Sequence, residues 1–309
     1  MKWKKLGIVW APDGTVPWAR THAMGPTPFL LTPNVIRVFL TSLDDKGRGR
    51  PIYVDVCAQD PRKVLAISCT PLLELGEPGC FDDNGVVGMS VMMMGHEKLF
   101  FYYSGFEICS QIRYRIFSGL AYGALLDEKF ERISKAPILD RVNSEPFFRA
   151  APFVMLDDGV FRMWYCGGGG WVQLNGKEMP IYDLRYAESS DGVNWSSISS
   201  MAMPITGSDE HGFGRPWVVK RGPKDYQMFY SVRRRSLAAY RLGYAESTDG
   251  INWVRKDSKM GLDVTPGEFD SDAIMYSAVI SVGDKTYCFY NGNNFGEKGF
   301  AIAELISEY

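Results

Sequence analysis

One ten-residue stretch occurs twice in this chain and constrains the fold more than any other feature. Residues 186–195 read Tyr-Ala-Glu-Ser-Ser-Asp-Gly-Val-Asn-Trp, and residues 244–253 repeat this with only Thr for Ser and Ile for Val. A long match of this kind is the mark of a repeated structural unit. In each copy, Asp-Gly supplies the positive φ that a tight turn requires. We expect the Trp that follows to fold back over apolar surface between neighbouring units.

The rest of the chain has the periodicity of short β-strands. Runs of β-branched and aromatic residues alternate with Gly, Pro, Asn and Asp, and no helical spacing persists beyond two turns. A strand rich in aromatic residues recurs, following a polar segment and a short apolar strand each time. Its copies are residues 35–40, 99–103, 161–165, 226–230 and 286–290. We therefore count five copies of the unit.

Five such units predict an all-β fold, a five-bladed β-propeller with four-stranded antiparallel blades that close radially. The last unit is one strand short, and the strand-like residues 3–10 are spare. We expect residues 3–10 to supply the outer strand of the last blade, because this pairing removes an open edge. The whole chain, 1–309, is then a single domain, with blades at residues 20–70, 78–135, 143–197, 208–255 and 268–309.

Composition narrows the classes of partner. The formal net charge is −2, which argues against nucleic acid. The sequence contains no run of about 18 apolar residues, so we expect no membrane span. The N-terminus lacks the apolar stretch of a secretory signal. The six cysteines are scattered without metal-type spacing. We therefore predict free thiols in a cytoplasmic protein, with no metal and no other cofactor.

Candidate functional residues cluster just before or within the first strand of each unit. In a propeller these innermost strands begin around one end of the central channel, so their polar residues are expected to converge. The residues are His22, Asp82, Asp83, Glu145, Arg149, Glu210, His211, Arg215, Asp270, Asp272 and Tyr276. We predict a ring of carboxylates around a saccharide, since glycoside hydrolysis needs a protonated acid and a second carboxylate. The alternative is that these acids accept backbone N–H groups or pair with arginines for structural reasons.

The arginines, histidines and asparagine among the candidates indicate the chemical class of the ligand. Arg149 and Arg215, with one or two histidines, suit a carboxylate or phosphate, so the expected partner is a carbohydrate, a sugar phosphate or a nucleotide sugar. The alternative is that both arginines neutralise the carboxylate ring. Asn291 is expected to bind sugar hydroxyls, and Trp171 to lie at the pocket rim after a wide turn at residues 167–170. Residues 233–235, three arginines, are interpreted as a solvated loop, with contact to an acidic glycan or to the phosphate of a nucleotide sugar as the alternative.

Several motifs resemble a known superfamily. They are the paired Tyr-Ala-x-Ser-x-Asp-Gly-x-x-Trp segments, the (Met/Cys)-(Trp/Phe)-Tyr strands, Phe269-Asp-Ser and Phe289-Tyr-Asn-Gly-Asn. The chain resembles the five-bladed propeller glycoside hydrolases, which include arabinanase, fructosidase and mannoside-phosphorylase types. It is most similar to members from bacterial surface-polysaccharide loci and to the N-terminal propeller of glucosamine inositolphosphorylceramide transferases.

This resemblance implies a glycosidase-like enzyme that acts on a glycosidic bond of a neutral or anionic sugar in surface-polysaccharide metabolism. A phosphorylase or glycosyl transferase is the first alternative, and a non-catalytic glycan-binding module is the second. By position it also implies Glu145 as general acid and Asp83 as the group that tunes the acid's pKa. The expected blade-one Asp base is replaced by His22, which leaves Asp270 or Asp272 as base, and Glu210 completes the catalytic set. The sugar, the stereochemical outcome and the oligomeric state stay open.

Overall fold

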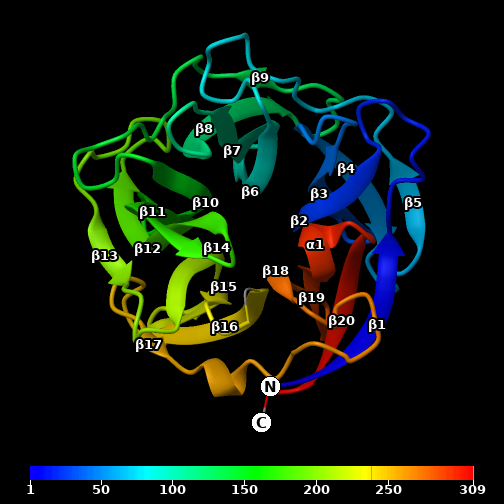
Figure 1. Ribbon diagram of the computed structural model, residues 1–309. Helices are drawn as coiled ribbons and strands as arrows, with labels where there is room; N and C mark the ends of the chain where they lie inside the picture. The colour runs from blue at the N-terminus through cyan, green and yellow to red at the C-terminus, as the bar shows by residue number, and fades with distance from the viewer. Residues whose placement is uncertain (238, 309) are drawn as a thin grey trace.

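The computed structural model describes residues 1–237 and 239–308 and shows five antiparallel blades around one axis (Figure 1). Blade I holds β2 (Thr21–Thr32), β3 (Val35–Leu43), β4 (Gly49–Cys57) and β5 (Val64–Ile67). Blade II holds β6 (Val86–Met94), β7 (Lys98–Ile108), β8 (Tyr114–Ala124) and β9 (Glu131–Arg132). Blade III holds β10 (Phe148–Asp157), β11 (Val160–Leu174), β12 (Lys177–Ser189) and β13 (Ser200–Met203). Blade IV holds β14 (Glu210–Gly222), β15 (Asp225–Arg234), β16 (Ala239–Ser247) and β17 (Val254–Arg255).

Blade V is assembled from both ends of the chain. It holds β18 (Met275–Val282), β19 (Lys285–Asn291) and β20 (Phe300–Ser307), and β1 (Lys2–Trp10) pairs antiparallel with β20. Figure 1 shows the blue N-terminal strand beside the red C-terminal one. The prediction that the N-terminal strand closes the last blade is confirmed. Blades II, III and IV are further joined by short parallel pairings of β8 with β10 and of β12 with β14.

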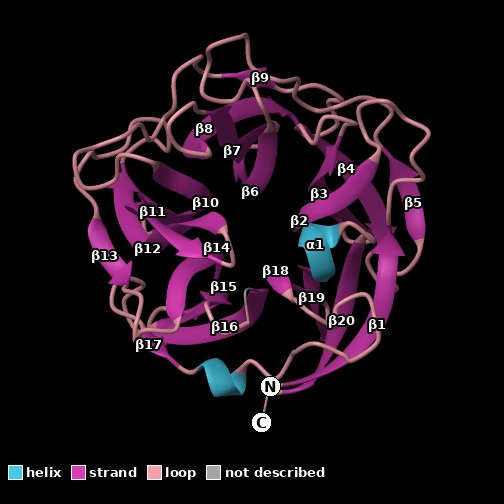
Figure 2. Ribbon diagram, viewed as in Figure 1, coloured by secondary structure: helices cyan, strands magenta, loops and turns pink. Residues whose placement is uncertain are grey.

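Within residues 1–237 and 239–308, helical structure is limited to two short turns (Figure 2). One is the 3₁₀ turn Asp257–Lys259 (η1), and the other is α1 (Asn293–Gly296) between β19 and β20. Asn294 and Phe295 have φ values of 51° and 59°, so α1 is a left-handed turn rather than a regular helix. Figure 1 shows that α1 lies beside β2 near the axis, where it can contribute side chains to the end of the channel.

The repeated ten-residue motif forms the same turn in blades III and IV. The Asp191 carboxylate accepts hydrogen bonds from the backbone N–H groups of Val193 and Asn194, both at 2.8 Å, and Gly192 has a φ of 74°. These hydrogen bonds hold the pKa of the Asp191 carboxyl well below its usual range. The Trp195 indole then folds back and donates to the Gly192 carbonyl at 3.2 Å. The second copy reproduces each of these contacts.

The same turn also joins neighbouring blades. The Gly192 carbonyl of blade III accepts a hydrogen bond from Tyr102 of blade II at 2.9 Å. The Gly250 carbonyl of blade IV accepts one from Trp164 of blade III at 2.8 Å. Because the aromatic donors are fully buried, each bond is protected from water. The repeat is therefore a joint between blades as well as a turn within one.

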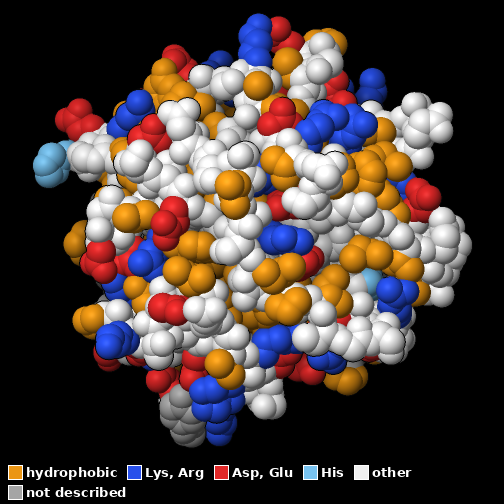
Figure 3. Space-filling view, turned by 90° about the vertical axis from the view of Figure 1, so that its left-hand side faces the viewer, with side chains coloured by type: hydrophobic (Ala, Val, Ile, Leu, Met, Phe, Trp, Pro, Cys, Tyr) orange, Lys and Arg blue, Asp and Glu red, His pale blue; other side chains and the backbone are white. Residues whose placement is uncertain are grey.

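The side of the molecule drawn in Figure 3 carries no dominant charge. Figure 3 shows Lys and Arg interspersed with Asp and Glu over one side of the molecule, as expected for a net charge of −2. All six cysteines are free thiols. Within the described residues, no helix has the length and apolar character needed to cross a membrane.

Candidate functional site

Four acids that precede or begin the innermost strands lie in buried polar clusters, one in each of blades II to V. Each has a cationic partner, and in three blades the cation comes from the outermost strand. The pairs are Asp82 with Arg132, Glu145 with Arg149, Glu210 with Arg255, and Asp270 with Lys5. We call these four ion pairs the carboxylate clasps.

Glu145 makes the most enclosed of the carboxylate clasps. Its side chain is fully buried, and Oε2 accepts hydrogen bonds from Arg149 Nε at 2.9 Å and from the Tyr165 hydroxyl at 2.7 Å. Its Oε1 accepts from the Ser199 hydroxyl at 2.6 Å. Arg149 also donates to the Asp140 carbonyl at 2.8 Å. Both charges are thus satisfied within blade III and the loops flanking its strands.

The other clasps follow the same plan. Asp82 accepts from Arg132 at 2.8 Å and from the Tyr103 hydroxyl at 3.0 Å. Asp270 lies 2.5 Å from Lys5 Nζ, so the N-terminal strand supplies the cation that completes blade V. The recurring tyrosine at the end of the aromatic strand is therefore a partner for a buried acid.

Glu210 is held by the two terminal nitrogens of Arg255, at 2.7 and 2.8 Å. Burial alone would raise the pKa of the Glu210 carboxyl, but the hydrogen bonds and charge of Arg255 outweigh it. The net pKa lies below its usual value, so Glu210 is a carboxylate at neutral pH. A general acid needs the opposite shift.

These positions correct the expected ring of carboxylates. Glu145, Glu210 and Asp270 do not line the central cavity, and each is neutralised by its own cation in its own blade. Asp83 lies in a loop outside the cavity and accepts the Gly79 N–H at 2.9 Å. Of the two interpretations of these acids, the structural pairing is the one that the geometry supports.

A bulge bends the innermost strand of several blades at an equivalent place. Four innermost strands have a register shift and a left-handed residue at the bulge: Gly25, Ala151, Arg215 and Tyr276, with φ of 65°, 53°, 27° and 59°. For residues other than Gly this conformation is strained, and such strain is often found at functional sites.

From its position in the bulge of β14, Arg215 donates hydrogen bonds to three other blades. Its guanidinium is 1% exposed and donates to the Pro26 and Tyr276 carbonyls at 2.7 and 3.2 Å. It also donates to the Thr27 hydroxyl at 2.6 Å and the Met89 carbonyl at 3.1 Å. Burial lowers the pKa of Arg215 to about 9, which still leaves it charged at neutral pH. Arg215 therefore joins blade IV to blades I, II and V through its terminal nitrogens, while its buried Nε has no hydrogen-bond partner among the described residues. It does not line the central cavity.

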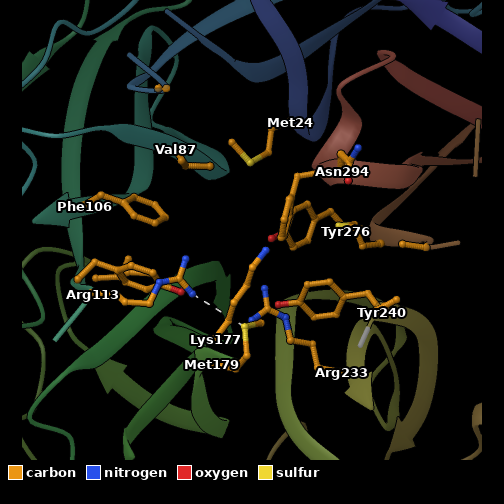
Figure 4. A pocket seen from close by; sticks show the side chains of 18 of the residues that line it. Met24, Val87, Phe106, Arg113, Lys177, Met179, Arg233, Tyr240, Tyr276 and Asn294 are labelled. Atoms are coloured by element: carbon orange, nitrogen blue, oxygen red, sulfur yellow. Dashed lines mark hydrogen bonds between the residues drawn. The ribbon is translucent and has the colours of Figure 1, made fainter. Parts of the chain in front are cut away.

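A cavity of about 850 Å³ opens at the end of the channel where the innermost strands begin (Figure 4). The charged side chains that line it are Arg113, Lys177, Arg233 and Asp272, of which the last is the only carboxylate among the described lining residues. The hydroxyl-bearing side chains are Tyr114, Tyr182, Tyr240 and Tyr276. Of the residues predicted from the sequence, only Asp272 and Tyr276 line this cavity.

Arg233 is the buried charge of this cavity. It lies near the end of β15, is 8% exposed, and places its guanidinium 4.5 Å from the Tyr240 ring and 5.8 Å from the Phe295 ring. Its Nη1 is buried and has no hydrogen-bond partner among the described residues. Leaving such a donor unpaired costs about 1–3 kcal/mol. A ligand oxygen would remove that cost, which makes Arg233 the natural anchor for an anion.

Tyrosine hydroxyls surround Arg233. The Tyr182 and Tyr240 hydroxyls lie 3.1 Å apart, and the Tyr276 ring lies 5.8 Å from that of Tyr240. Burial raises the pKa of all three phenols, so they stay neutral hydrogen-bond donors at any physiological pH. Asp272 is exposed and accepts a hydrogen bond from Asn293 at 3.1 Å. The cavity thus offers several donors and one accessible acid.

The remaining predicted residues lie around this cavity without lining it. His22 is half-buried with a φ of 66°, and burial lowers the pKa of its imidazole. His211 is buried and contacts the Pro180 carbonyl at 3.2 Å through Nδ1. The Asn291 side chain already makes its hydrogen bonds to backbone groups of blades I and V: it accepts from the Gly25 N–H at 2.8 Å and donates to the Ala23 and Gly299 carbonyls. None of the three contacts the cavity through its side chain.

Residues 167–170 are not the wide turn that was expected. They lie inside β11 with a register shift between Gly167 and Gly170, and the turn comes later, at Asn175 and Gly176. A Cβ on Gly168 would lie 2.3 Å from the Ile181 carbonyl oxygen, so close strand packing explains a glycine there. Trp171 packs on Tyr114 and Phe148 at 5.3 and 5.1 Å, behind the cavity wall.

The sequence alone gives no role in the cavity to Arg113, Lys177 or the tyrosines Tyr114, Tyr182 and Tyr240. For Arg233 it favours a solvated loop, with contact to an acidic glycan or a nucleotide-sugar phosphate as the alternative. One signal in the sequence indicates that Arg233 can be buried. Arg233 lies near the end of an aromatic strand, and successive side chains of a strand alternate between the buried and the exposed face. Within the described residues, no group of three or more His, Cys, Asp or Glu side chains is arranged to hold a metal ion.

Comparison with known proteins places the chain in a family. No protein-family model matches it. It is 33% identical over 305 residues to Rv1502 of Mycobacterium tuberculosis, described as an uncharacterized protein, and the alignment covers 99% of both chains. The chain belongs to the family of Rv1502. It is also 31% identical over 133 residues to the 1,2-beta-oligomannan phosphorylase of Thermoanaerobacter sp. strain X514, which covers 41% of this chain and 44% of that one.

Solved structures share the fold at low sequence identity. A glycosyl hydrolase from Bacteroides ovatus superposes with a TM-score of 0.72 at 15% identity, covering 100% of this chain and 94% of that one. A structure from the GH130 family of mannoside phosphorylases superposes with a TM-score of 0.64 at 14% identity, covering 98% and 96%. The fold is therefore the five-bladed propeller of glycoside hydrolases and phosphorylases.

Proposed function

We propose that this protein is a carbohydrate-active enzyme that cleaves or forms a glycosidic bond in the axial cavity, with phosphate as the second reactant. The observation that carries the proposal is Arg233, a buried guanidinium with an unpaired N–H and no carboxylate partner among the described residues. Lys177 and Arg113 add two more cations, against the single carboxylate of Asp272 in the described lining. Arginine and lysine side chains in such a setting favour phosphate oxygens.

The number of carboxylates favours phosphorolysis over hydrolysis. Two-carboxylate hydrolysis needs an acid and a second carboxylate that attacks the sugar or activates water. Phosphorolysis needs only the acid, because a phosphate oxygen is the nucleophile. The partial likeness to 1,2-beta-oligomannan phosphorylase supports the same choice.

The proposed reaction assigns one role to each group. A phosphate oxygen, held by Arg233 and Lys177, attacks the anomeric carbon while the bond from that carbon to the leaving oxygen breaks. The leaving oxygen takes the electron pair of that bond and receives the proton that dihydrogen phosphate gives up, relayed through the Asp272 carboxylate. The products are a sugar 1-phosphate and the shortened saccharide, and tyrosine hydroxyls orient the sugar.

Hydrolysis is the second candidate, since the fold is shared with glycoside hydrolases. It requires a second carboxylate near Asp272, and the clasp acids are already paired. A cytoplasmic location and a role in surface-polysaccharide metabolism stay predictions of the sequence.

The deciding experiment is a screen of nitrophenyl glycosides and disaccharides, including β-1,2-linked mannobiose, with and without inorganic phosphate. We expect cleavage that depends on phosphate and yields a sugar 1-phosphate. Arg233→Met should raise the KM for phosphate at least about tenfold, and Asp272→Asn should lower kcat by about 10²–10⁴. Arg62→Met is the matched control, because Arg62 is an exposed arginine paired with Asp60. Cleavage at equal rates without phosphate, unchanged in Arg233→Met, would replace phosphorolysis with hydrolysis.

A further inference from the structure

One half of the axial cavity, the wall built by blades I and II, is mostly apolar. Figure 4 shows Met24, Val87 and Phe106 on one side and Lys177, Arg233 and Tyr240 on the other. Lys177, Arg233 and three of the four lining tyrosines come from blades III, IV and V, together with apolar side chains such as Met179, Met275 and Phe295. Blades I and II contribute six apolar side chains: Met24, Leu43, Val87, Phe106, Ile108 and Ile116. Their polar contributions are limited to Asn84, Arg113 and Tyr114 among the described lining residues.

The apolar half is a poor partner for a sugar ring. Saccharide hydroxyls that lose water need hydrogen-bond partners, and an unpaired polar group in an apolar site is unfavourable. Met24, Val87 and Ile116 offer none through their side chains. At about 850 Å³ the cavity is also in the upper part of the roughly 300–1,000 Å³ typical of small-molecule sites. A single anionic sugar on the Arg233 side leaves the apolar side uncovered.

The mouth of the cavity also has exposed apolar side chains. Ile108 of blade II and Leu237 of blade IV both line the cavity and are 58% and 44% exposed. A ligand that extends to the mouth would cover such side chains. The apolar strip thus runs from Met24 and Val87 inside the cavity to Ile108 at its mouth.

We propose that the ligand of this cavity is amphiphilic, a phosphorylated or otherwise anionic saccharide that carries an alkyl or acyl chain. The anionic group binds Arg233, and the chain lies along Met24, Val87 and Phe106 toward Ile108. This inference rests on the proposed function, because it uses the same anion site.

The test compares methyl phosphate with hexyl phosphate by calorimetry on the full chain. Each buried methylene is worth about fourfold in affinity, so partial burial should make hexyl phosphate bind about tenfold or more tightly. Met24→Gln, a polar side chain of the same length, should cut this ratio about threefold or more, whereas Met24→Leu should keep it. Far-ultraviolet circular dichroism and thermal unfolding confirm that each variant is folded. Phe106→Ala is the second variant if Met24→Gln does not fold.

The outcomes separate the two proposals. Equal affinities for methyl and hexyl phosphate, or a ratio unchanged in both Met24→Gln and Phe106→Ala, would overturn the amphiphilic ligand alone. Failure of methyl phosphate to bind, or binding that Arg233→Met leaves intact, would overturn the anion site and with it the proposed function. Cosedimentation with phosphatidylcholine vesicles containing phosphatidic acid, lost in Arg233→Met, would assign the chain to a bilayer lipid. Binding of soluble hexyl phosphate without cosedimentation would assign it to a free glycoside.

Discussion

Arg255 and Arg233 belong to the same blade and have opposite surroundings. Arg255 donates to both oxygens of Glu210 and lies 2.5 Å from Asp257, so the fold itself neutralises its charge. Arg233 faces aromatic rings, and a buried N–H has no described partner. The first arginine holds the blade together, whereas the second is available to a ligand.

The same contrast separates the carboxylate clasps from the axial cavity. In the clasps, every acid has a cation and most have a tyrosine hydroxyl as well. In the described lining of the cavity, three cations face one exposed carboxylate. A recurring acid in a repeat protein is thus a poor guide to catalysis, because a repeated fold also repeats its structural ion pairs. Four measurements of the free energy of unfolding would break or sharpen the comparison.

The largest loss is expected at the most enclosed clasp. Glu145→Gln leaves the buried Arg149 guanidinium without a counter-charge, which should cost about 3–5 kcal/mol in the free energy of unfolding. Urea denaturation measures this, with Glu128→Gln as the control at an exposed acid. A stable variant that has lost all glycosidase activity would instead restore Glu145 as the general acid.

A somewhat smaller loss is expected for Arg255→Met, about 3 kcal/mol, because Glu210 and Asp257 lose their partner but stay partly hydrated. The side chains of Glu210 and Asp257 are 10% and 25% exposed. Urea denaturation of this variant and of Arg233→Met forms a matched pair within one blade. Equal losses in the two variants would show that the contrast between the arginines is unfounded.

The third effect depends on pH. Because the pKa of Glu210 is lowered in the folded state, its ion pair stabilises the protein above the unfolded pKa of about 4.3. That stabilisation is lost as the pH falls through the folded pKa. At pH 7, Glu210→Gln should be less stable than the native protein by about 2 kcal/mol, and the difference should shrink progressively as the pH falls below about 4.3. A difference that does not vary with pH would exclude the ion pair as its source.

The smallest change in stability is expected for Arg233→Met, within about 1 kcal/mol, because the substitution removes an unsatisfied buried donor and keeps an apolar stem. The same variant should weaken phosphate binding at least about tenfold. Urea denaturation and calorimetry on one preparation give both numbers. A large loss of stability with phosphate binding intact would make Arg233 a structural residue like Arg255.

Much of the architecture was readable from local signals. The repeated turn at residues 186–195 and 244–253, the aromatic strands, and the spare strand near the N-terminus each depend on a few adjacent residues. Turn chemistry and side-chain alternation act over such short distances, so the sequence determined the blades and their closure without reference to distant contacts.

Tertiary structure alone decided which charges are free. Asp270 is neutralised by Lys5, more than two hundred residues away, and no local pattern reveals that pairing. The bulges with left-handed residues turn Arg215 toward carbonyls of three other blades and leave Tyr276 at the cavity. Arg233 lies opposite Tyr240 on the paired strand of its own blade, but it reaches Phe295 only when blades IV and V close around the axis. Sequence determined which residues could carry charge near the axis, and radial packing decided which of them still lack a partner.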